Sequence, residues 1–202
     1  MMMRLDFLDI AGSGDLYLVV MKAICGDTAN KSMVDLMCHH APYTPMLGFK
    51  DRLYVDLLDR GMDHKEEQVN FLRMDIWKFF FEYRNRSWDV MICSDGIEHL
   101  HKKQGYEMLS HMKSMSDKSI IFTPLGDCNI SNDNHPDSHK SGWLPEDFSS
   151  EYAVLVFPDF HPTIKVGAFF AWRCSGIQQD FDRVKKELNK LIGLKYNHSN
   201  DN

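Results

Sequence analysis

The chain has 202 residues, of which 44% are hydrophobic, and a formal net charge of −6. One domain with a full core fits this length, so residues 1–202 are expected to form a single domain. The negative charge without a basic block argues against nucleic acid and anionic membranes as partners, and no apolar run is long enough to cross a bilayer. Five scattered cysteines without a CxxC pair are typical of reduced thiols, which predicts a cytoplasmic protein.

Short apolar runs bounded by turn residues predict strands, and apolar residues at helical spacing predict helices. In chain order, the predicted strands are 32–37, 52–57, 68–73, 88–93, 118–123, 152–157 and 165–173. The predicted helices are 15–26, 75–83, 102–115, a short one at Pro145, and 177–191. Residues 1–30 are interpreted as an N-terminal helical extension and 195–202 as a flexible tail. The polar segment 127–142 is predicted to be a long loop.

Strand and helix alternate through the first five predicted strands, which favours a parallel sheet with helices on both faces. The last two strands are joined by a turn with two prolines, so one of them is expected to run antiparallel. Open α/β sheets bind ligands at the carboxyl ends of their strands. Ser94, Asp95 and Gly96 follow the apolar run 90–93 and are therefore the first candidates for a site.

Residues 88–99, WDVMICSDGIEH, begin with an aromatic residue and an acid, continue as an apolar strand, and end in a turn with an acid and a histidine. This segment resembles the fourth-strand signature of class I S-adenosylmethionine-dependent methyltransferases, and the resemblance extends over most of the chain. It implies a Rossmann-like α/β fold, in which a seven-stranded, mostly parallel sheet has an antiparallel edge strand and helices on both faces. It also implies S-adenosylmethionine as the cofactor.

In that family the first strand ends in an acid and a glycine-rich turn, whose backbone lies against the amino acid part of the cofactor. The matching acid is Asp35, but Met37, His39 and Ala41 occupy the glycine positions. Glycine is favoured where the backbone approaches a ligand closely or takes a positive φ. Either the turn follows another path, or the pocket no longer takes the cofactor as the family does. The resemblance assigns Asp35, Met37 and His39 to cofactor binding.

Further cofactor contacts are implied at the tips of the neighbouring strands. Asp56 follows the second strand at the spacing of an acid that binds ribose hydroxyls, with Asp59 or a plain turn acid as alternatives. Met74 and Asp75 follow the third strand, where the resemblance implies contacts with the adenine ring and its amino group. Asp75 is equally interpreted as a helix cap. Ser94 is implied to line the methyl pocket.

Methyl transfer requires an aligned acceptor and, for some acceptors, a group that takes its proton. Asp95 is a catalytic candidate on the cleft side of the central strand, and His99 is a candidate base because histidine titrates near neutrality. The alternative is that His99 packs inside a helical turn. His135 and His139 are further catalytic candidates in the long loop, which the resemblance makes a lid over the acceptor.

A zinc site is the remaining possibility for the histidine-rich segments. Cys38, His39 and His40, together with His135 and His139, offer enough donors. They lack a regular ligand spacing, however, and the sequence predicts no metal.

These features predict S-adenosylmethionine-dependent methyl transfer to a small-molecule acceptor. The acceptor class follows from the absence of a basic surface and of an added recognition domain. Two alternatives stay open: a catalytically inactive methyltransferase-like subunit that binds a partner, and another enzyme that takes a nucleotide-like ligand in the same crevice. The sequence identifies neither the acceptor nor the oligomeric state.

Overall fold

In the computed structural model, the described residues are 2–4, 13–127, 131, 135–161 and 166–199, and they form one eight-stranded sheet with helices on both faces. The strands are β1 (Met2–Arg4), β2 (Ser32–Leu36), β3 (Asp51–Asp56), β4 (Phe71–Arg73), β5 (Trp88–Ser94), β6 (Ser116–Pro124), β7 (Ala153–His161) and β8 (Val166–Arg173). The α-helices are α1 (Ser13–Cys25), α2 (Ile76–Glu82), α3 (Lys102–Met115) and α4 (Ile177–Ser199). Short 3-10 helices are η1 (Thr44–Leu47), η2 (Lys65–Asn70), η3 (Ile97–His99) and η4 (Pro145–Asp147).

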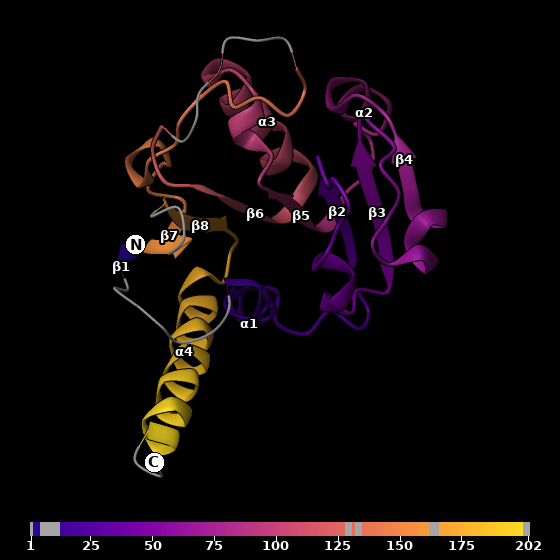
Figure 1. The fold of residues 1–202 in the computed structure, drawn as a ribbon. Coiled ribbons are helices and arrows are strands. Elements are labelled where there is room, and N and C mark those ends of the chain that lie inside the picture. The colour runs from indigo at the N-terminus through magenta and orange to yellow at the C-terminus, as the bar shows by residue number, and fades with distance from the viewer. Residues whose placement is uncertain (1, 5–12, 128–130, 132–134, 162–165, 200–202) are drawn as a thin grey trace.

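Helices cover both faces of the sheet, and successive side chains of a strand point to opposite faces, so neighbouring residues enter different cores. In Figure 1, α2 and α3 lie above the sheet, and α1 and α4 lie below it. Met33 of β2 belongs to the core with α1 and α4, whereas its neighbour Val34 belongs to the core with α2 and α3. Ile92 and Met91 of β5 divide in the same way. This double burial explains why the strands appear in the sequence as continuous apolar runs.

The spatial order of the strands is β1-β7-β8-β6-β5-β2-β3-β4. Strands β3 and β4 lie on one side of β2 and β5 lies on the other, so the order of the strands reverses between β2 and β5. These two strands are parallel, with Asp35 opposite Ile92. In open α/β sheets, ligands bind in the crevice outside the carboxyl ends of the strands at such a reversal point. The ends of β2, at Leu36, and of β5, at Ser94, therefore mark the expected position of a site.

The predicted seven-stranded, mostly parallel sheet is confirmed. The antiparallel strand is β8, which lies between β6 and β7, and the three-residue strand β1 pairs with β7 as an additional edge strand. Strand β4 is shorter than expected, because residues 68–70 belong to η2. The hydrogen bond from Met74 N to Asp56 O (2.8 Å) continues the β3–β4 contact beyond β4.

The helices follow the predicted segments, with differences at the two ends of the chain. Helix α3 has the predicted bounds, and α4 continues through Ser199, so the segment expected to be a flexible tail from residue 195 is helical up to that residue. Helix α1 is not an appended extension, because Val20, Met21 and Ile24 are fully buried in the core that α1 shares with α4. Residues 5–12 and 200–202 lie outside the described residues.

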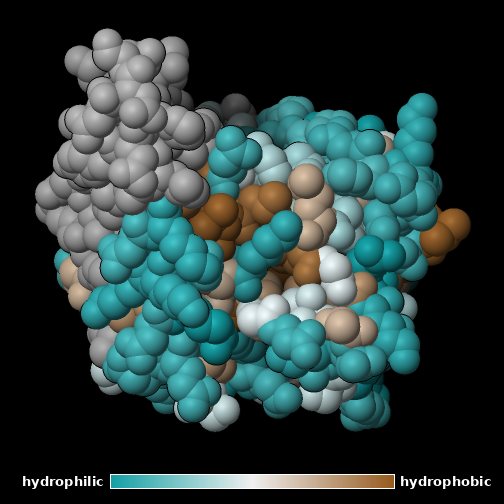
Figure 2. All heavy atoms as spheres, turned by 90° about the horizontal axis from the view of Figure 1, so that it is seen from below, coloured by the Kyte–Doolittle hydropathy of each residue, from teal (hydrophilic) through white to brown (hydrophobic). Residues whose placement is uncertain are grey.

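The surface seen from below is mostly hydrophilic, and hydrophobic residues gather near the centre of the view, where the surface is hollowed (Figure 2). None of the helices in the described part of the chain has the length and apolar character needed to span a membrane. Four of the five cysteines lie in the described part and are free thiols, as expected: Cys25, Cys38, Cys93 and Cys174.

Candidate active site

A cavity of about 470 Å³ lies at the strand ends where the sheet order reverses. Its walls come from α1, from the ends of β2, β5, β6 and β7, from the segments that follow β2 and β5, and from the segment that precedes η4. The lining residues are Gly14, Tyr17, Asp35, Cys38, His39, Ala41, Pro42, Tyr43, Thr44, Ser94, Asp95, His99, Phe122, Asp137 and Phe160. Three of these residues are aspartates and none is a lysine or an arginine, so the cavity favours a cationic ligand.

The turn after β2 has the backbone shape that glycines would give it. Met37, His39 and Ala41 have φ angles of 56°, 51° and 45°. The hydrogen bond from Ala41 N to Cys38 O (2.7 Å) closes the turn. The turn takes left-handed conformations at all three glycine positions, although each side chain makes them unfavourable by about 1–2 kcal/mol.

The three side chains of this turn do not all face the cavity. Met37 packs with the core on the α2 and α3 side, and a Cβ placed on Gly96 would lie 3.0 Å from its Cβ. His39 and Ala41 border the cavity, whereas Met37 is absent from its lining. The largest side chain of the altered turn therefore leaves the cavity open.

Replacing His39 with glycine is expected to stabilise the protein by about 0.5–1 kcal/mol. The exchange removes the left-handed strain, and the greater freedom of glycine in the unfolded chain offsets part of that gain. His39 is exposed, so little packing is lost. Urea unfolding should show a higher midpoint for His39→Gly with an unchanged slope. His40→Gly is the matched control and should destabilise, because His40 has no left-handed φ to relieve and its Nδ1 lies 2.9 Å from Gly61 O.

Asp35, at the end of β2, presents an unpartnered carboxylate oxygen at the cavity wall. Its side chain is only 2% exposed, and the Thr44 hydroxyl donates a 2.5 Å hydrogen bond to Oδ2. Oδ1 is buried and has no hydrogen-bond partner. Burial raises the pKa of Asp35 from 3.8 to about 7; the Thr44 hydrogen bond opposes this rise and the negative charge of Asp56 adds to it. The free oxygen is thus a candidate acceptor for a cationic group.

Of the other predicted cofactor residues, Ser94 lines the cavity, whereas Asp56, Met74 and Asp75 are not part of its lining. Asp56 accepts hydrogen bonds from His39 N and Leu58 N, both of 2.9 Å, so its carboxylate supports the turn after β2. Asp75 is the N-cap of α2 and accepts bonds from the first turn of that helix. Met74 is partly buried against the core on the α2 and α3 side. Asp56 ends β3, and Met74 and Asp75 follow β4, so these three residues lie at the ends of the strands that come after β2 in the sheet.

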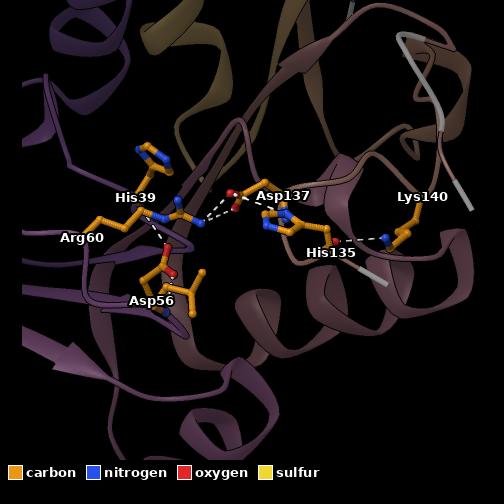
Figure 3. Close-up of polar contacts among 7 residues, drawn as sticks. His39, Asp56, Arg60, His135, Asp137 and Lys140 are labelled. Atoms are coloured by element: carbon orange, nitrogen blue, oxygen red, sulfur yellow. Dashed lines mark hydrogen bonds and ion pairs between the residues drawn. The ribbon is translucent and has the colours of Figure 1, made fainter. Parts of the chain in front are cut away.

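An ion pair connects the β3 side of this crevice to the long loop (Figure 3). The Arg60 guanidinium contacts both carboxylate oxygens of Asp137, at 2.6 and 2.5 Å. His135 Nδ1 lies 3.8 Å from the same carboxylate, and Lys140 donates to His135 O (3.1 Å). His135 is exposed and outside the cavity lining, whereas Asp137 borders it. The loop therefore reaches over the crevice through Asp137, a residue that the sequence analysis did not select.

The polar end of the cavity is formed by the turn after β5. Asp95 has a φ of 47° and faces the cavity, and surrounding protein atoms raise the pKa of its carboxyl. Glu98 is buried behind it, with its pKa raised by burial and by the charge of Asp95. Burial and the nearby His139 lower the pKa of His99, which keeps its imidazole neutral near pH 7. His99 and His139 are in edge contact, with ring centroids 5.0 Å apart.

The end of the long loop is fixed against η3. Lys140 N and Ser141 N both donate to Glu98 O, at 2.7 and 3.1 Å, and Ser141 Oγ donates to Leu100 O at 2.8 Å. Trp143 Nε1 in turn donates to Ser141 Oγ at 3.0 Å. These bonds hold His139 next to His99, although the two residues are far apart in the sequence. Residues 128–130 and 132–134 of this loop lie outside the described residues.

Solved structures with the same fold identify the architecture. The magnesium protoporphyrin IX methyltransferase ChlM from Synechocystis PCC 6803 is similar over 80% of this chain and 79% of its own, at 14% identity and a TM-score of 0.52. An S-adenosylmethionine-dependent methyltransferase from Clostridium acetobutylicum ATCC 824 covers 83% and 94% of the two chains, at 12% identity and a TM-score of 0.55. The methyltransferase domain of the bacterial protein CtHen1 covers 81% and 100%, at 14% identity and a TM-score of 0.52.

The chain has the class I methyltransferase fold. No family model and no curated protein sequence matches it, so these likenesses concern the fold alone. Relative to the methyltransferase fold that the sequence resembles, the main departure is the turn after β2, where three residues with side chains adopt the conformations of glycines.

The part of the site that α1 and the last strands provide was not predicted from the sequence. Tyr17 of α1 is hydrogen-bonded to Ser94 (2.5 Å between oxygens) and packs against Phe122 of β6. Phe160 of β7 completes this aromatic wall of the cavity. The interpretation of residues 1–30 as an extension concealed Tyr17, and the available signal was its hydroxyl within the apolar run 16–21.

Proposed function

We propose that the protein catalyses S-adenosylmethionine-dependent methyl transfer to a small-molecule acceptor. The observation that carries the proposal is a cavity at the strand-order reversal with three aspartates and no lysine or arginine in its lining. S-adenosylmethionine carries a sulfonium and an ammonium group, and such an acidic cavity suits both. The free thiols support the cytoplasm as the compartment, where cysteines stay reduced.

The residues present fit the amino acid part of this cofactor. Asp35 Oδ1 is buried without a partner and would accept a hydrogen bond from the ammonium group. The left-handed turn brings its backbone to the cavity as a glycine-rich turn would, with His39 and Ala41 at the border. Tyr17, Phe122 and Phe160 offer aromatic faces to a sulfonium.

The cofactor, when bound, supplies an electrophilic methyl group for direct displacement. The chain's own part is to align the acceptor, exclude water and take a proton where the acceptor has one. Asp95 and His99 stand at the polar end of the cavity, and the neutral imidazole of His99 is able to accept a proton. His139 would orient the His99 ring, and Asp137 would close the crevice through its ion pair with Arg60.

The size of the cavity supports a small acceptor. A volume of about 470 Å³ is in the lower part of the range for small-molecule sites, roughly 300–1,000 Å³. A net charge of −6 is unfavourable for a polyanionic acceptor. The neighbouring structures differ in acceptor: one is named for a porphyrin and another, HEN1, for small RNA, so fold likeness does not choose between acceptor classes.

Calorimetry with S-adenosylmethionine and S-adenosylhomocysteine tests the proposal. The intact chain should bind both at one site. Asp56→Asn should weaken both affinities by roughly 10- to 100-fold, because it replaces a charged hydrogen-bonding group next to the crevice. Asp51→Asn, an exposed acid at the opposite end of β3, is the matched control and should bind as the wild type does.

Absence of binding by the wild-type chain would reject the methyl-transfer proposal and favour a catalytically inactive partner subunit. Binding of adenosine nucleotides in place of both compounds would favour another enzyme that uses the same crevice. Equal affinity of wild type and Asp56→Asn would remove Asp56 from the cofactor site.

A further inference from the structure

One group of side chains at the polar end of the cavity has the composition of a metal centre. Glu98, His99 and His139 each offer one ligand atom, and these atoms all lie within 4.8 Å of one another. Within the part of the chain that the structure describes, no other three His, Cys, Asp or Glu residues are grouped in this way. Two imidazoles and one carboxylate are a common ligand set for divalent first-row transition metals.

The three residues are held in place by hydrogen bonds from neighbouring elements. The Thr123 hydroxyl of β6 donates to Glu98 Oε2 at 2.9 Å and so orients the carboxylate. The carbonyl of Glu98 binds Lys140 N and Ser141 N, which fixes the segment that follows His139. Supporting contacts of this kind, from outside the ligand set, orient the ligands of protein metal sites.

The charges at this point are not balanced by protein cations. In the described chain no lysine or arginine forms an ion pair with Glu98 or with the nearby Asp95. Buried carboxylates are normally paired or coordinate a metal, and Glu98 is 3% exposed. Nδ1 of His99 is also buried without a hydrogen-bond partner. A bound cation would satisfy both groups.

We infer that Glu98, His99 and His139 bind one divalent transition-metal cation in the wall of the cavity. Ligand atoms about 2.1 Å from one ion lie at most about 4.2 Å apart, so a small side-chain rotation brings the three atoms into range. His99 borders the cavity, and an ion on it would keep open positions toward the cavity for water or a substrate oxygen. Asp95 is close enough in the chain to serve as a further ligand or to bind through water.

The consequence for catalysis rests on the proposed function. An ion here would hold an acceptor hydroxyl and lower its pKa, which favours attack on a methyl donor. His99 would then act as a ligand, since a nitrogen bound to a metal cannot also take a proton. The substrate class that fits is a small molecule with an oxygen able to coordinate a divalent cation.

Titration of the chelator-treated full chain with MnCl₂ and ZnCl₂ tests the metal site without any methyl donor. One Mn²⁺ per chain should bind, and electron spin-echo spectra of the bound ion should show coupling to imidazole nitrogen. Glu98→Gln, which retains the acceptor for Thr123, and His139→Asn should each weaken binding by at least about tenfold. His101→Asn is the matched control: His101 is exposed, lies two residues from His99 and caps α3, a role that asparagine also fills.

The inference is overturned if the wild-type chain binds no stoichiometric Mn²⁺ or Zn²⁺, if bound Mn²⁺ shows no nitrogen coupling, or if both ligand variants bind as His101→Asn does. The spectrum of the wild-type chain needs no variant, so a variant that fails to fold leaves the test intact. Calorimetry with S-adenosylmethionine on the metal-free chain separates the two proposals. Methyl-donor binding without metal binding rejects the metal site alone, and the reverse result rejects the proposed function alone.

Discussion

Trp143→Ala is expected to reduce the free energy of unfolding by about 3–5 kcal/mol, the range for loss of a large buried aromatic side chain. Trp143 is fully buried beneath α3 and contacts the Tyr106 and Phe148 rings at centroid distances of 5.3 and 5.7 Å. Lys102 Nζ lies 3.9 Å above its ring. For a chain of this size, such a loss lowers the melting temperature by roughly 10 °C.

The same substitution should also disturb the polar end of the cavity. Trp143 anchors the end of the long loop, because its main chain bonds Gly126 and its indole bonds Ser141. Calorimetric unfolding of Trp143→Ala and of Tyr106→Ala compares a buried ring with its 44% exposed neighbour. Tyr106→Ala should reduce the free energy of unfolding by less than half as much as Trp143→Ala does. Equal losses would show that the indole is not the anchor of this region.

A double-mutant cycle with Gly105 isolates the contact. A Cβ on Gly105 would lie 2.3 Å from Trp143 Cζ2, so Gly105→Ala should destabilise the wild type by about 1–3 kcal/mol. In the Trp143→Ala background the space is free, and alanine should stabilise α3 by about 0.5–1 kcal/mol relative to glycine. The change of sign is the expected result. Additive effects would mean that the two residues do not meet.

Most of the fold could be predicted from the sequence, because local patterns report which faces are buried. The strands of a doubly covered sheet are apolar on both faces, and β5 and β6 appear in the sequence as short apolar runs. The helices follow the spacing of their apolar residues, as α3 does. Strand β1 and the start of β4 were not predictable, because three-residue strands form only when a neighbouring strand offers free backbone groups.

The candidate site was predicted only in part, and the reason differs from residue to residue. Ser94 ends an apolar strand and Asp95 follows it, so their positions at the cavity could be inferred from the sheet, and Asp35 could be assigned through the family resemblance. The proximity of His139 to His99 depends on bonds from the main chain of Lys140 and Ser141, which no side-chain pattern records. The left-handed turn was unexpected because residue type predicts φ only as a preference, and surrounding contacts override it here.

Asp35→Asn is expected to change how stability depends on pH. The pKa of Asp35 is 3.8 in the unfolded chain and about 7 in the folded chain. Between these values the folded chain retains a proton that the unfolded chain has lost, so folding is favoured most at low pH and stability falls as the pH rises toward 7. The difference of about three units between the two pKa values corresponds to about 4 kcal/mol of stability. The wild type loses this stability as the pH rises, and Asp35→Asn does not. The unfolding free energy of Asp35→Asn minus that of the wild type should therefore be about 4 kcal/mol larger above pH 7 than at pH 4.

Urea unfolding of both chains from pH 4 to pH 8 measures this difference. Asp95 and Glu98 also have raised pKa values, but they are present in both chains and cancel when the two curves are subtracted. Asparagine places an amide where Oδ1 of Asp35 has no partner, and this penalty does not vary with pH because an amide does not titrate between pH 4 and pH 8. Asp51→Asn, which changes an exposed acid, should run parallel to the wild type at every pH. Parallel curves for Asp35→Asn as well would mean that burial does not keep this carboxyl protonated. The curves should diverge, and the variant should also lose affinity for S-adenosylmethionine. Both results together would show that the buried carboxyl of Asp35 costs stability and serves to bind the ammonium group of the cofactor.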